Sequence, residues 1–341
     1  MNKSEGVSIK DVAEEAGVSP TTVSRVINDS DHPVNEKTRE IVEKAIKKLD
    51  YQPNRLAQGL KKNKSNIIGV IVHDISDEYF AQLVKGIEAV TFDNDYIVNI
   101  INTQRNIHKE LKAVTMLKAN RAEAIIFTGG NLNNEYYNKK MKDHIKDLKK
   151  QGTYILGVTS HPHDIINIKI GNKKAAAIIT NYMLKQGRDK IGFVNGPEIL
   201  STSEQRLEGY KETLQAAGKK IDSNIILPGD FSFEGGRRAA KKLLDKDISR
   251  IEAVIASNDE TALGLIWELT QNNINIPGNI AIGGIGDIPA SKYTNPPLTT
   301  VSLPLYDLGK KLGEKVVNFL KKDKKTGDIK VDIGLVKRES A

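Results

Sequence analysis

The chain has 341 residues, no cysteine and a formal charge of +8. This length suits two or three domains, and the absence of cysteine excludes disulfide scaffolds, thiolate metal sites and a cysteine nucleophile. No apolar run is long enough to cross a membrane, and the polar residues 1–9 lack the apolar stretch of a signal peptide. We therefore expect a cytoplasmic protein that makes no membrane contact.

The excess of basic residues is uneven along the chain. Residues 37–64 contain nine basic and three acidic side chains. A lysine-rich surface can produce the overall surplus without any polyanionic partner. A basic segment beside a small domain is also typical of nucleic-acid binding. The segment therefore makes DNA or RNA a candidate partner.

Two short helices joined by a glycine turn are predicted near the N-terminus. Gly17 ends the first helix, because glycine enters the left-handed region at little cost. Ser19 then caps a second helix that has Pro20 in its first turn. A third helix with an apolar face begins after Asn35. Together these helices predict an all-α helix-turn-helix head over residues 1–52.

The second helix carries small and polar side chains on its outer face. Small side chains let a helix enter the major groove, and the guanidinium of Arg25 can make a forked contact with guanine. Hydroxyl and amide groups suit phosphate oxygens. A small helical protein-interaction domain is the alternative interpretation. The candidate backbone contacts are Ser19, Thr22, Ser24 and Asn28.

A segment of marginal helix propensity follows the head at residues 53–65. Pro53 stops the third helix and can open a short new one, whereas Gly59 weakens that helix by about 1 kcal/mol. A helix of so few residues is not stable alone. We therefore expect this hinge to fold only on a partner.

Three stretches of the N-terminal part carry a specific signature, Ile9-Lys10-Asp11-Val12-Ala13, Thr22-Val23-Ser24-Arg25-Val26-Ile27-Asn28 and Tyr51-Gln52-Pro53-Asn54. They closely resemble the lactose/galactose repressor family of bacterial transcription regulators. In that family the hinge helix forms on DNA in a dimer, and its leucine enters the minor groove and kinks the operator. The resemblance implies this role for Leu60, a DNA contact at Asn54, and base reading by Pro20, Thr21 and Arg25.

Beyond the hinge, apolar runs rich in Ile and Val alternate with amphipathic stretches. Such runs are typical of parallel strands covered on both faces, and their spacing is the βαβ pattern. The length favours two lobes over one sheet. The predicted strands are Ile67–Val72, Tyr96–Ile101, Ala124–Phe127, Tyr154–Val158, Ile191–Val194, Ala253–Ala256 and Ile280–Ile285, and the predicted helices include Phe80–Phe92, Lys109–Lys118, Lys174–Gln186 and Glu204–Ala217.

The resemblance continues through this core, at Arg206 with Gly209-Tyr210, at Ser257-Asn258-Asp259 and at Asn295-Pro296-Pro297-Leu298-Thr299-Thr300-Val301. It implies a two-lobed α/β core like that of periplasmic sugar-binding proteins, with parallel sheets, a ligand cleft between the lobes and three crossovers. The implied boundaries are 66–165 with 295–326 for lobe one, and 166–294 with 327–341 for lobe two.

The candidate effector site lies beyond the carboxyl ends of the strands, where parallel α/β sheets bind ligands. Asp74, Tyr79 and Phe80 follow the first strand; the two rings can stack on a sugar, although Phe80 suits the core equally well. The resemblance places Arg206 against ligand hydroxyls or carboxylates, with a surface salt bridge as the alternative. Asp259 can accept from two hydroxyls or cap the next helix.

Two glycines depart from the family pattern. Gly286 and Gly171 stand where many members carry an aspartate, while Asp287 aligns with the second acid of the last loop. Fewer carboxylates in the cleft would suit an effector that is itself acidic. A sugar, a sugar acid and a sugar phosphate all remain candidates.

No motif for catalysis is recognisable. The chain lacks a nucleophile elbow, a P-loop and a dinucleotide-binding glycine motif after a strand. The run His161-Pro162-His163-Asp164 resembles a metal triplet, but a solvent-exposed loop is the favoured interpretation because no further ligand is identifiable. We expect no enzyme activity and no cofactor.

These features together predict a homodimeric transcriptional regulator of carbohydrate-metabolism genes. Two heads would bind the half-sites of a palindromic double-stranded operator, and a sugar-like effector would control them. Repression with induction is the family default, whereas a corepressor such as a serine-phosphorylated phosphocarrier protein would reverse the sign. A sugar-binding transport protein is a poorer fit, because the head has no place in it.

Overall fold

The computed structural model describes residues 7–27, 32–51, 65–159, 161–246, 251–322 and 329–341. The chain divides into two compact units, Met1–Ser65 and Asn66–Ala341. The predicted hinge falls almost entirely outside the described residues. No described helix is both long enough and apolar enough to span a membrane.

The first unit contains the three predicted helices, α1 (Ile9–Ala16), α2 (Pro20–Ile27) and α3 (Glu36–Lys48). The predicted start and stop signals are confirmed. Gly17 ends α1 in the left-handed region at φ 63°. The Ser19 hydroxyl accepts a hydrogen bond from the Thr22 amide at 3.1 Å, so it caps α2.

The head is held together by a small apolar core. Helices of eight residues are marginal in water, so their stability must come from packing against one another. The buried members of this core are Val12, Ala13, Ala16, Val23, Val26, Val42 and Ala45.

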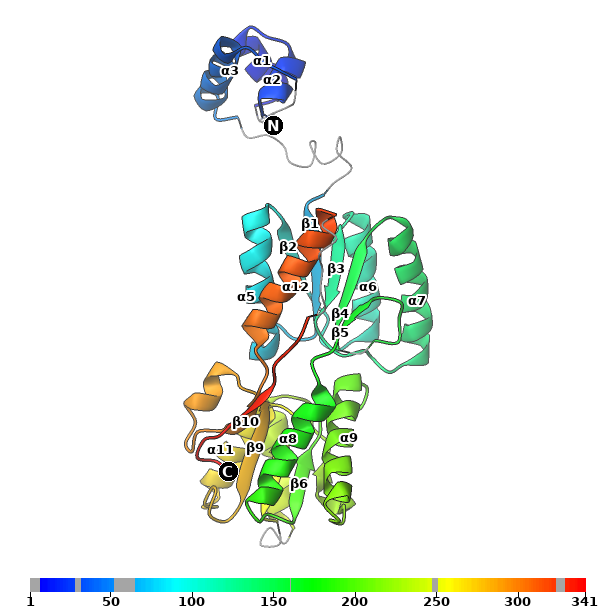
Figure 1. Cartoon of the computed structure of the whole chain (residues 1–341), viewed down its shortest axis with the longest axis vertical. Helices are drawn as coiled ribbons and strands as arrows, with labels where there is room; N and C mark the ends of the chain where they lie inside the picture. The colour runs from blue at the N-terminus through cyan, green and yellow to red at the C-terminus, as the bar shows by residue number, and fades with distance from the viewer. Residues whose placement is uncertain (1–6, 28–31, 52–64, 160, 247–250, 323–328) are drawn as a thin grey trace, which may run out of the picture. The chain divides into compact units, whose positions relative to one another are not determined.

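The second unit has two lobes, each built around a sheet (Figure 1). The first sheet is wholly parallel in the order β2-β1-β3-β4-β5. Helices α5 and α12 cover one face and helices α6 and α7 cover the other. The bounds are β1 Ile67–Val72, β2 Ile97–Asn102, β3 Ala124–Phe127, β4 Tyr154–Val158, β5 Ile166–Ile168, α5 Glu78–Thr91, α6 Ile107–Ala119, α7 Glu135–Lys150 and α12 Leu305–Leu320.

The second sheet has the order β11-β10-β9-β8-β6-β7. All of its neighbouring pairs are parallel except β10 with β11. Helices α8 and α9 cover one face, and α10 and α11 cover the other. The bounds are β6 Ile191–Val194, β7 Ile226–Leu227, β8 Ala253–Ala256, β9 Ala281–Gly286, β10 Thr299–Ser302, β11 Gly334–Val336, α8 Asn172–Lys185, α9 Ser201–Ala216, α10 Phe233–Leu244 and α11 Asp259–Gln271.

Alternate residues of the central strands supply the two layers of core. In β1, Val70 packs with the layer of α5 and α12, whereas Ile71 packs with that of α6 and α7. Successive side chains of a strand point to opposite faces, so a strand buried on both sides must be apolar throughout. This explains why the Ile- and Val-rich runs show no alternation with polar residues.

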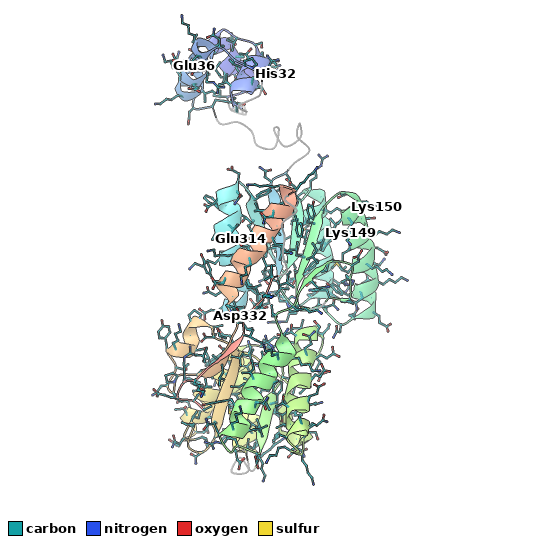
Figure 2. The ribbon with its side chains drawn as sticks, viewed as in Figure 1. His32, Glu36, Lys149, Lys150, Glu314 and Asp332 are labelled. Atoms are coloured by element: carbon teal, nitrogen blue, oxygen red, sulfur yellow. The ribbon has the colours of Figure 1, made fainter. Side chains whose placement is uncertain are left out.

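The chain passes between the lobes three times, after β5, after β10 and between α12 and β11. Asp332 lies on the last of these crossings (Figure 2). Two of the predicted lobe boundaries are wrong. Residues 166–168 form β5 and pair with β4 in the first sheet, and residues 299–302 form β10 beside β9 in the second. The pairing partner, which lies far away in sequence, decides to which lobe a short strand belongs.

Candidate functional site: the cleft between the lobes

A cavity lies between the two lobes, at the carboxyl ends of the parallel strands. The first lobe contributes residues that follow β1, β2 and β3, and the second contributes the start of α9 and the residues after β7, β8 and β9. The polar and aromatic lining is His73, Asp77, Tyr79, Phe80, Arg105, Thr202, Arg206, Phe231, Asn258, Asp259 and Glu260, with backbone from Gly129, Gly130 and Gly286.

A short run of hydrogen bonds joins the lobes beside this cavity. The Asn131 amide donates to the Ser201 hydroxyl at 3.0 Å, and the Ser201 amide donates to the Asn131 carbonyl at 3.1 Å. Leu132 and Leu200 form an isolated antiparallel bridge. Any ligand that changes the distance between the lobes must strain or break these bonds.

Arg206 is the cavity's buried cation. Its Nε donates to Asn172 Oδ1 at 3.0 Å, and a terminal nitrogen donates to the Ser257 carbonyl. Burial lowers the pKa of its guanidinium from the usual high value, and arginine keeps its charge in proteins nonetheless. The alternative of a surface salt bridge is wrong, because the side chain is buried in the cleft and neither acceptor is charged.

Asp259 is bonded to the protein on both of its carboxylate oxygens. Oδ2 accepts from the Ile288 amide at 3.1 Å and the Ser291 hydroxyl at 2.7 Å, and Oδ1 accepts from Thr300 Oγ1 at 2.5 Å. Burial raises the pKa of Asp259, and the three bonds oppose that rise. Asn258, rather than Asp259, caps α11. Asp259 therefore holds the residues after β9 and the start of β10 in place beside the cavity.

Of the three effector contacts predicted in the loop after β1, two line the cavity and one does not. Tyr79 and Phe80 both line the cavity, and Phe80 is also part of the core. Asp74 does not line the cavity; it accepts from the amide and the hydroxyl of Ser76, so its prediction as a cleft residue is not supported. Asp77 lines the cavity instead and caps α5 by accepting from the Tyr79 amide at 2.9 Å. Burial raises the pKa of Asp77.

Asp287 also lies outside the cavity lining. Its Oδ1 accepts from a terminal nitrogen of Arg338 at 2.5 Å, and the two side chains form an ion pair. The preceding residue, Gly286, has φ 153°, and a Cβ there would lie 3.3 Å from Asp259 Oδ2. Glycine thus allows the backbone to pass close to a buried carboxylate, where a second acid would be repelled. Gly171 directly precedes α8 and is in the left-handed region at φ 73°, and it does not line the cavity either.

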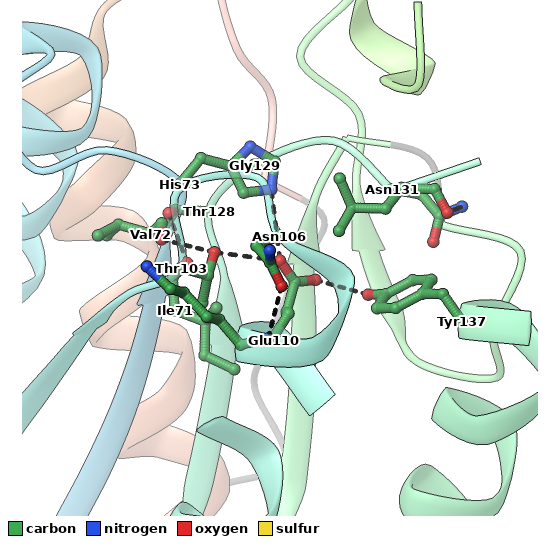
Figure 3. A network of polar contacts seen from close by, with 12 residues as sticks. Ile71, Val72, His73, Thr103, Asn106, Glu110, Thr128, Gly129, Asn131 and Tyr137 are labelled. Carbon is green, nitrogen blue, oxygen red and sulfur yellow. Dashed lines mark hydrogen bonds and ion pairs between the residues drawn. The ribbon is translucent and has the colours of Figure 1, made fainter. Parts of the chain in front are cut away.

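A buried polar network supports the cavity from the first lobe (Figure 3). Tyr137 donates to Glu110 Oε1 at 2.5 Å, and His73 Nε2 lies 3.6 Å from Glu110 Oε2. Burial acts to raise the pKa of Glu110, but His73 and the Tyr137 hydroxyl together hold that pKa below its usual value. The ionised carboxylate therefore fixes the ring of His73 against the cavity.

His161 lies next to this network and is buried. Its Nε2 donates to the Gly129 carbonyl at 3.2 Å. The interpretation of residues 161–164 as a solvent-exposed loop is therefore wrong for His161. Among the residues that the structure describes, no group of three or more His, Asp or Glu side chains is placed to hold a metal ion.

The buried imidazole of His161 should make the core sensitive to acid. Burial lowers the pKa of His161 to about 4, whereas the unfolded chain takes up the proton near 6.5. Because the unfolded state binds the proton first, stability is lost as the pH falls from about 6.5 to about 4, by about 3 kcal/mol. Urea unfolding of His161→Gln should show a shallower fall between pH 7 and pH 4. His108→Gln, at an exposed histidine of α6, is the control, and equal slopes for both variants would contradict the prediction.

Several cavity residues were not among the effector contacts predicted from the sequence. They are His73, Asp77, Arg105, Thr202, Phe231, Asn258 and Glu260. Arg105 follows β2 closely, so a search after every predicted strand would have found it. Phe231 follows β7, which has two residues and leaves no periodic signal.

The predicted DNA contacts of the head lie in and beside α2. Pro20, Thr21 and Arg25 are exposed, whereas Thr22 and Ser24 are half-buried. Ser19 is exposed as well and carries the cap described above. The remaining predicted contacts, Asn28, Asn54 and Leu60, lie outside the described residues.

Comparisons with known proteins match both units. Residues 8–54 match the family of bacterial regulatory proteins, lacI family, and residues 65–339 match the periplasmic binding proteins and sugar binding domain of LacI family. Catabolite control protein A of Priestia megaterium is 32% identical over 320 residues, 93% of each chain. The HTH-type transcriptional repressor CytR of Escherichia coli K12 is 30% identical over 304 residues, 89% of this chain and 86% of that one.

A solved structure agrees with these relatives. The crystal structure of the lac repressor dimer bound to operator and the anti-inducer ONPF aligns with a TM-score of 0.85 at 26% identity, covering 98% of this chain and 99% of that one. A helix-turn-helix head joined to a two-lobed α/β core with a polar cleft defines a DNA-binding regulator that senses a small molecule. The chain belongs to the LacI family of bacterial transcriptional regulators. Its relatives are regulators rather than enzymes.

Proposed function

We propose that this regulator is a homodimeric repressor that binds a palindromic operator and is controlled by a small sugar-like effector in the cleft. The observation that carries the proposal is the polar cavity lined from both lobes, in a chain that also has a DNA-binding head. A two-fold dimer presents two heads to two half-sites, which is why the operator should be palindromic.

The cleft offers a physical route for control. An effector shifts an equilibrium only by its difference in affinity for the two states, and a ligand that touches both lobes distinguishes their arrangements. The hydrogen bonds between Asn131 and Ser201 support this role, because they exist only when the lobes are close. Coupling of this kind changes DNA affinity by about 5- to 150-fold.

A second candidate mechanism is control by a corepressor. The similarity to a catabolite control protein favours it, and the serine-phosphorylated phosphocarrier protein expected from the sequence would then be the added partner. In this case the added partner strengthens DNA binding instead of releasing it.

A mobility-shift titration on palindromic duplexes tests the proposal. The full chain should bind one palindrome at least about a thousandfold more tightly than a scrambled duplex of equal length. A sugar, or the phosphorylated phosphocarrier protein, should then change that affinity, and the direction of the change separates the two mechanisms. Equal binding to the palindromes and the scrambled duplex would overturn the proposal.

A further inference from the structure

We propose that the effector carries an anionic group, a carboxylate or a phosphate on a sugar-sized molecule, which Arg105 binds together with Arg206 across the cleft. The inference rests on the proposed function, because it concerns the ligand of the same cavity. Four features of the cavity support it.

The first feature is that Arg206 is buried with no carboxylate bonded to it, although Asp259 and Asp77 act on its charge from farther away. Burying a charge is costly unless it is paired, and a guanidinium in a cleft is usually neutralised by a carboxylate. Within the described parts of the chain, no carboxylate oxygen lies within 4.0 Å of the guanidinium of Arg206 or of Arg105. The protein supplies Arg206 with only two uncharged acceptors, Asn172 and the Ser257 carbonyl.

The second feature is the position of Arg105. Its Nε is buried and has no hydrogen-bond partner in the structure. A buried donor without an acceptor is costly, so a group that supplies the acceptor binds more tightly. Arg105 lies in the loop after β2 in the left-handed region at φ 57°, and it lines the cavity from the first lobe.

The third feature is that both guanidinium groups approach one aromatic ring. The guanidinium carbon of Arg105 lies 5.8 Å from the centre of the Phe231 ring, and that of Arg206 lies 6.0 Å from it. Two cations near one ring repel each other in a low-dielectric site, and an anion bound by both offsets that repulsion. Arg105 belongs to the first lobe and Arg206 to the second, so one anion would link the lobes.

The fourth feature is that the acids of the cavity are already occupied or are easily neutralised. Both oxygens of Asp259 accept bonds from the protein. Asp77 caps α5, and burial raises its pKa as it also raises that of Glu260. The carboxyl groups of Asp77 and Glu260 can accept from the hydroxyls of the ligand's sugar part, which leaves the arginines for its anion.

The start of α9 adds a hydroxyl to the cavity lining. The Ser201 amide already donates to the Asn131 carbonyl, so the free contribution of this turn comes from its side chains. Thr202 in that turn lines the cavity. A phosphate or carboxylate can therefore use forked guanidinium bonds and a hydroxyl together.

Matched pairs of small molecules test the proposal by isothermal titration calorimetry on the full chain. The carboxylate arm compares glucuronate with glucose and gluconate with sorbitol; the phosphate arm compares glucose 6-phosphate with glucose and fructose 6-phosphate with fructose. At least one anion should bind at least about a hundredfold more tightly than its neutral counterpart. If the tighter binding occurs in the carboxylate arm, the anionic group is a carboxylate; if it occurs in the phosphate arm, the group is a phosphate.

Arginine variants supply the decisive comparison. Arg105→Gln should weaken binding of that anion by about tenfold to a hundredfold, and Arg105→Lys should fall between it and the unmodified chain, because it keeps the charge and loses the fork. Lys112→Gln removes the same charge from the exposed face of α6 and should bind normally. Thermal unfolding of each variant without ligand checks that the core is intact.

The inference is overturned if no anion of either arm binds, if a neutral sugar binds as tightly as its anionic counterpart, or if Arg105→Gln retains full affinity for the anion. These results differ from failure of the proposed function. A neutral sugar that alters the mobility shift would leave the proposed function standing, whereas an unmodified chain that does not distinguish palindromes would contradict the proposed function alone.

Discussion

Replacing Arg25 by alanine is expected to weaken binding to the palindromic operator by at least about thirtyfold. Arg25 lies exposed on α2, and a forked arginine–guanine pair contributes about 1–3 kcal/mol. A dimer loses two such pairs, one in each half-site, so the loss is about 2–6 kcal/mol. Fluorescence anisotropy with labelled operator at one fixed salt concentration measures it, because phosphate contacts make every affinity salt-dependent.

Two variants separate the loss of a base contact from the loss of charge. Arg25→Lys keeps the charge but cannot make the forked contact, so it should bind with intermediate affinity and accept changes at the contacted base pair. Lys10→Ala removes a charge from the exposed side of α1 and should have a smaller effect. If Arg25→Ala binds its operator as tightly as the unmodified chain, α2 does not read the operator through this residue.

Replacing Asp259 by alanine is expected to lower the free energy of unfolding of the core by about 3–5 kcal/mol. The carboxylate is buried and accepts from Ile288, Ser291 and Thr300. Its removal leaves three buried donors without an acceptor, and each such donor is costly. Urea unfolding followed by the fluorescence of Trp267, the single tryptophan, reports on this region because Trp267 lies on α11 with Asp259.

Matched variants test whether the three bonds cause the loss. Asp259→Asn keeps the shape and one acceptor oxygen, so it should be destabilised less than the alanine variant. Asp245→Ala removes an exposed carboxylate at the end of α10 and should change stability by at most about 0.5 kcal/mol. Similar unfolding midpoints for Asp259→Ala and Asp245→Ala would show that the bonded carboxylate does not stabilise the core.

Most of the long elements were predictable from local sequence. The runs at Ile67–Val72 and Ala253–Ala256 form strands with the predicted bounds, because a strand covered on both faces must be apolar at every position. The strands β5, β7, β10 and β11 were not predicted. The strands β5, β7 and β11 have two or three residues, which is too short for a periodic signal. The four residues of β10, Thr299–Ser302, include only one apolar side chain, so they do not form an apolar run.

The candidate site was predictable only in part. Arg206, Asp259, Tyr79 and Phe80 do line the cavity, as the resemblance and the rule about strand ends implied. The role of Asp259 was not predictable, because its three donors come from residues 288–300, brought to it by the pairing of β9 with β10.

The amino-acid order alone was enough to reveal the head, the alternation of strands and helices, and the family. Capping residues, turn glycines and apolar periodicity act over a few residues, so they can be read locally. Only the tertiary structure decided which lobe the short strands join. It also showed that Asp74 bonds to Ser76 and Asp287 to Arg338, outside the cavity. The approach of Arg105 and Arg206 to the same ring, Phe231, was likewise visible only in the fold. Those facts depend on contacts between residues far apart in sequence, where burial and charge are set by the assembled neighbours rather than by the local pattern.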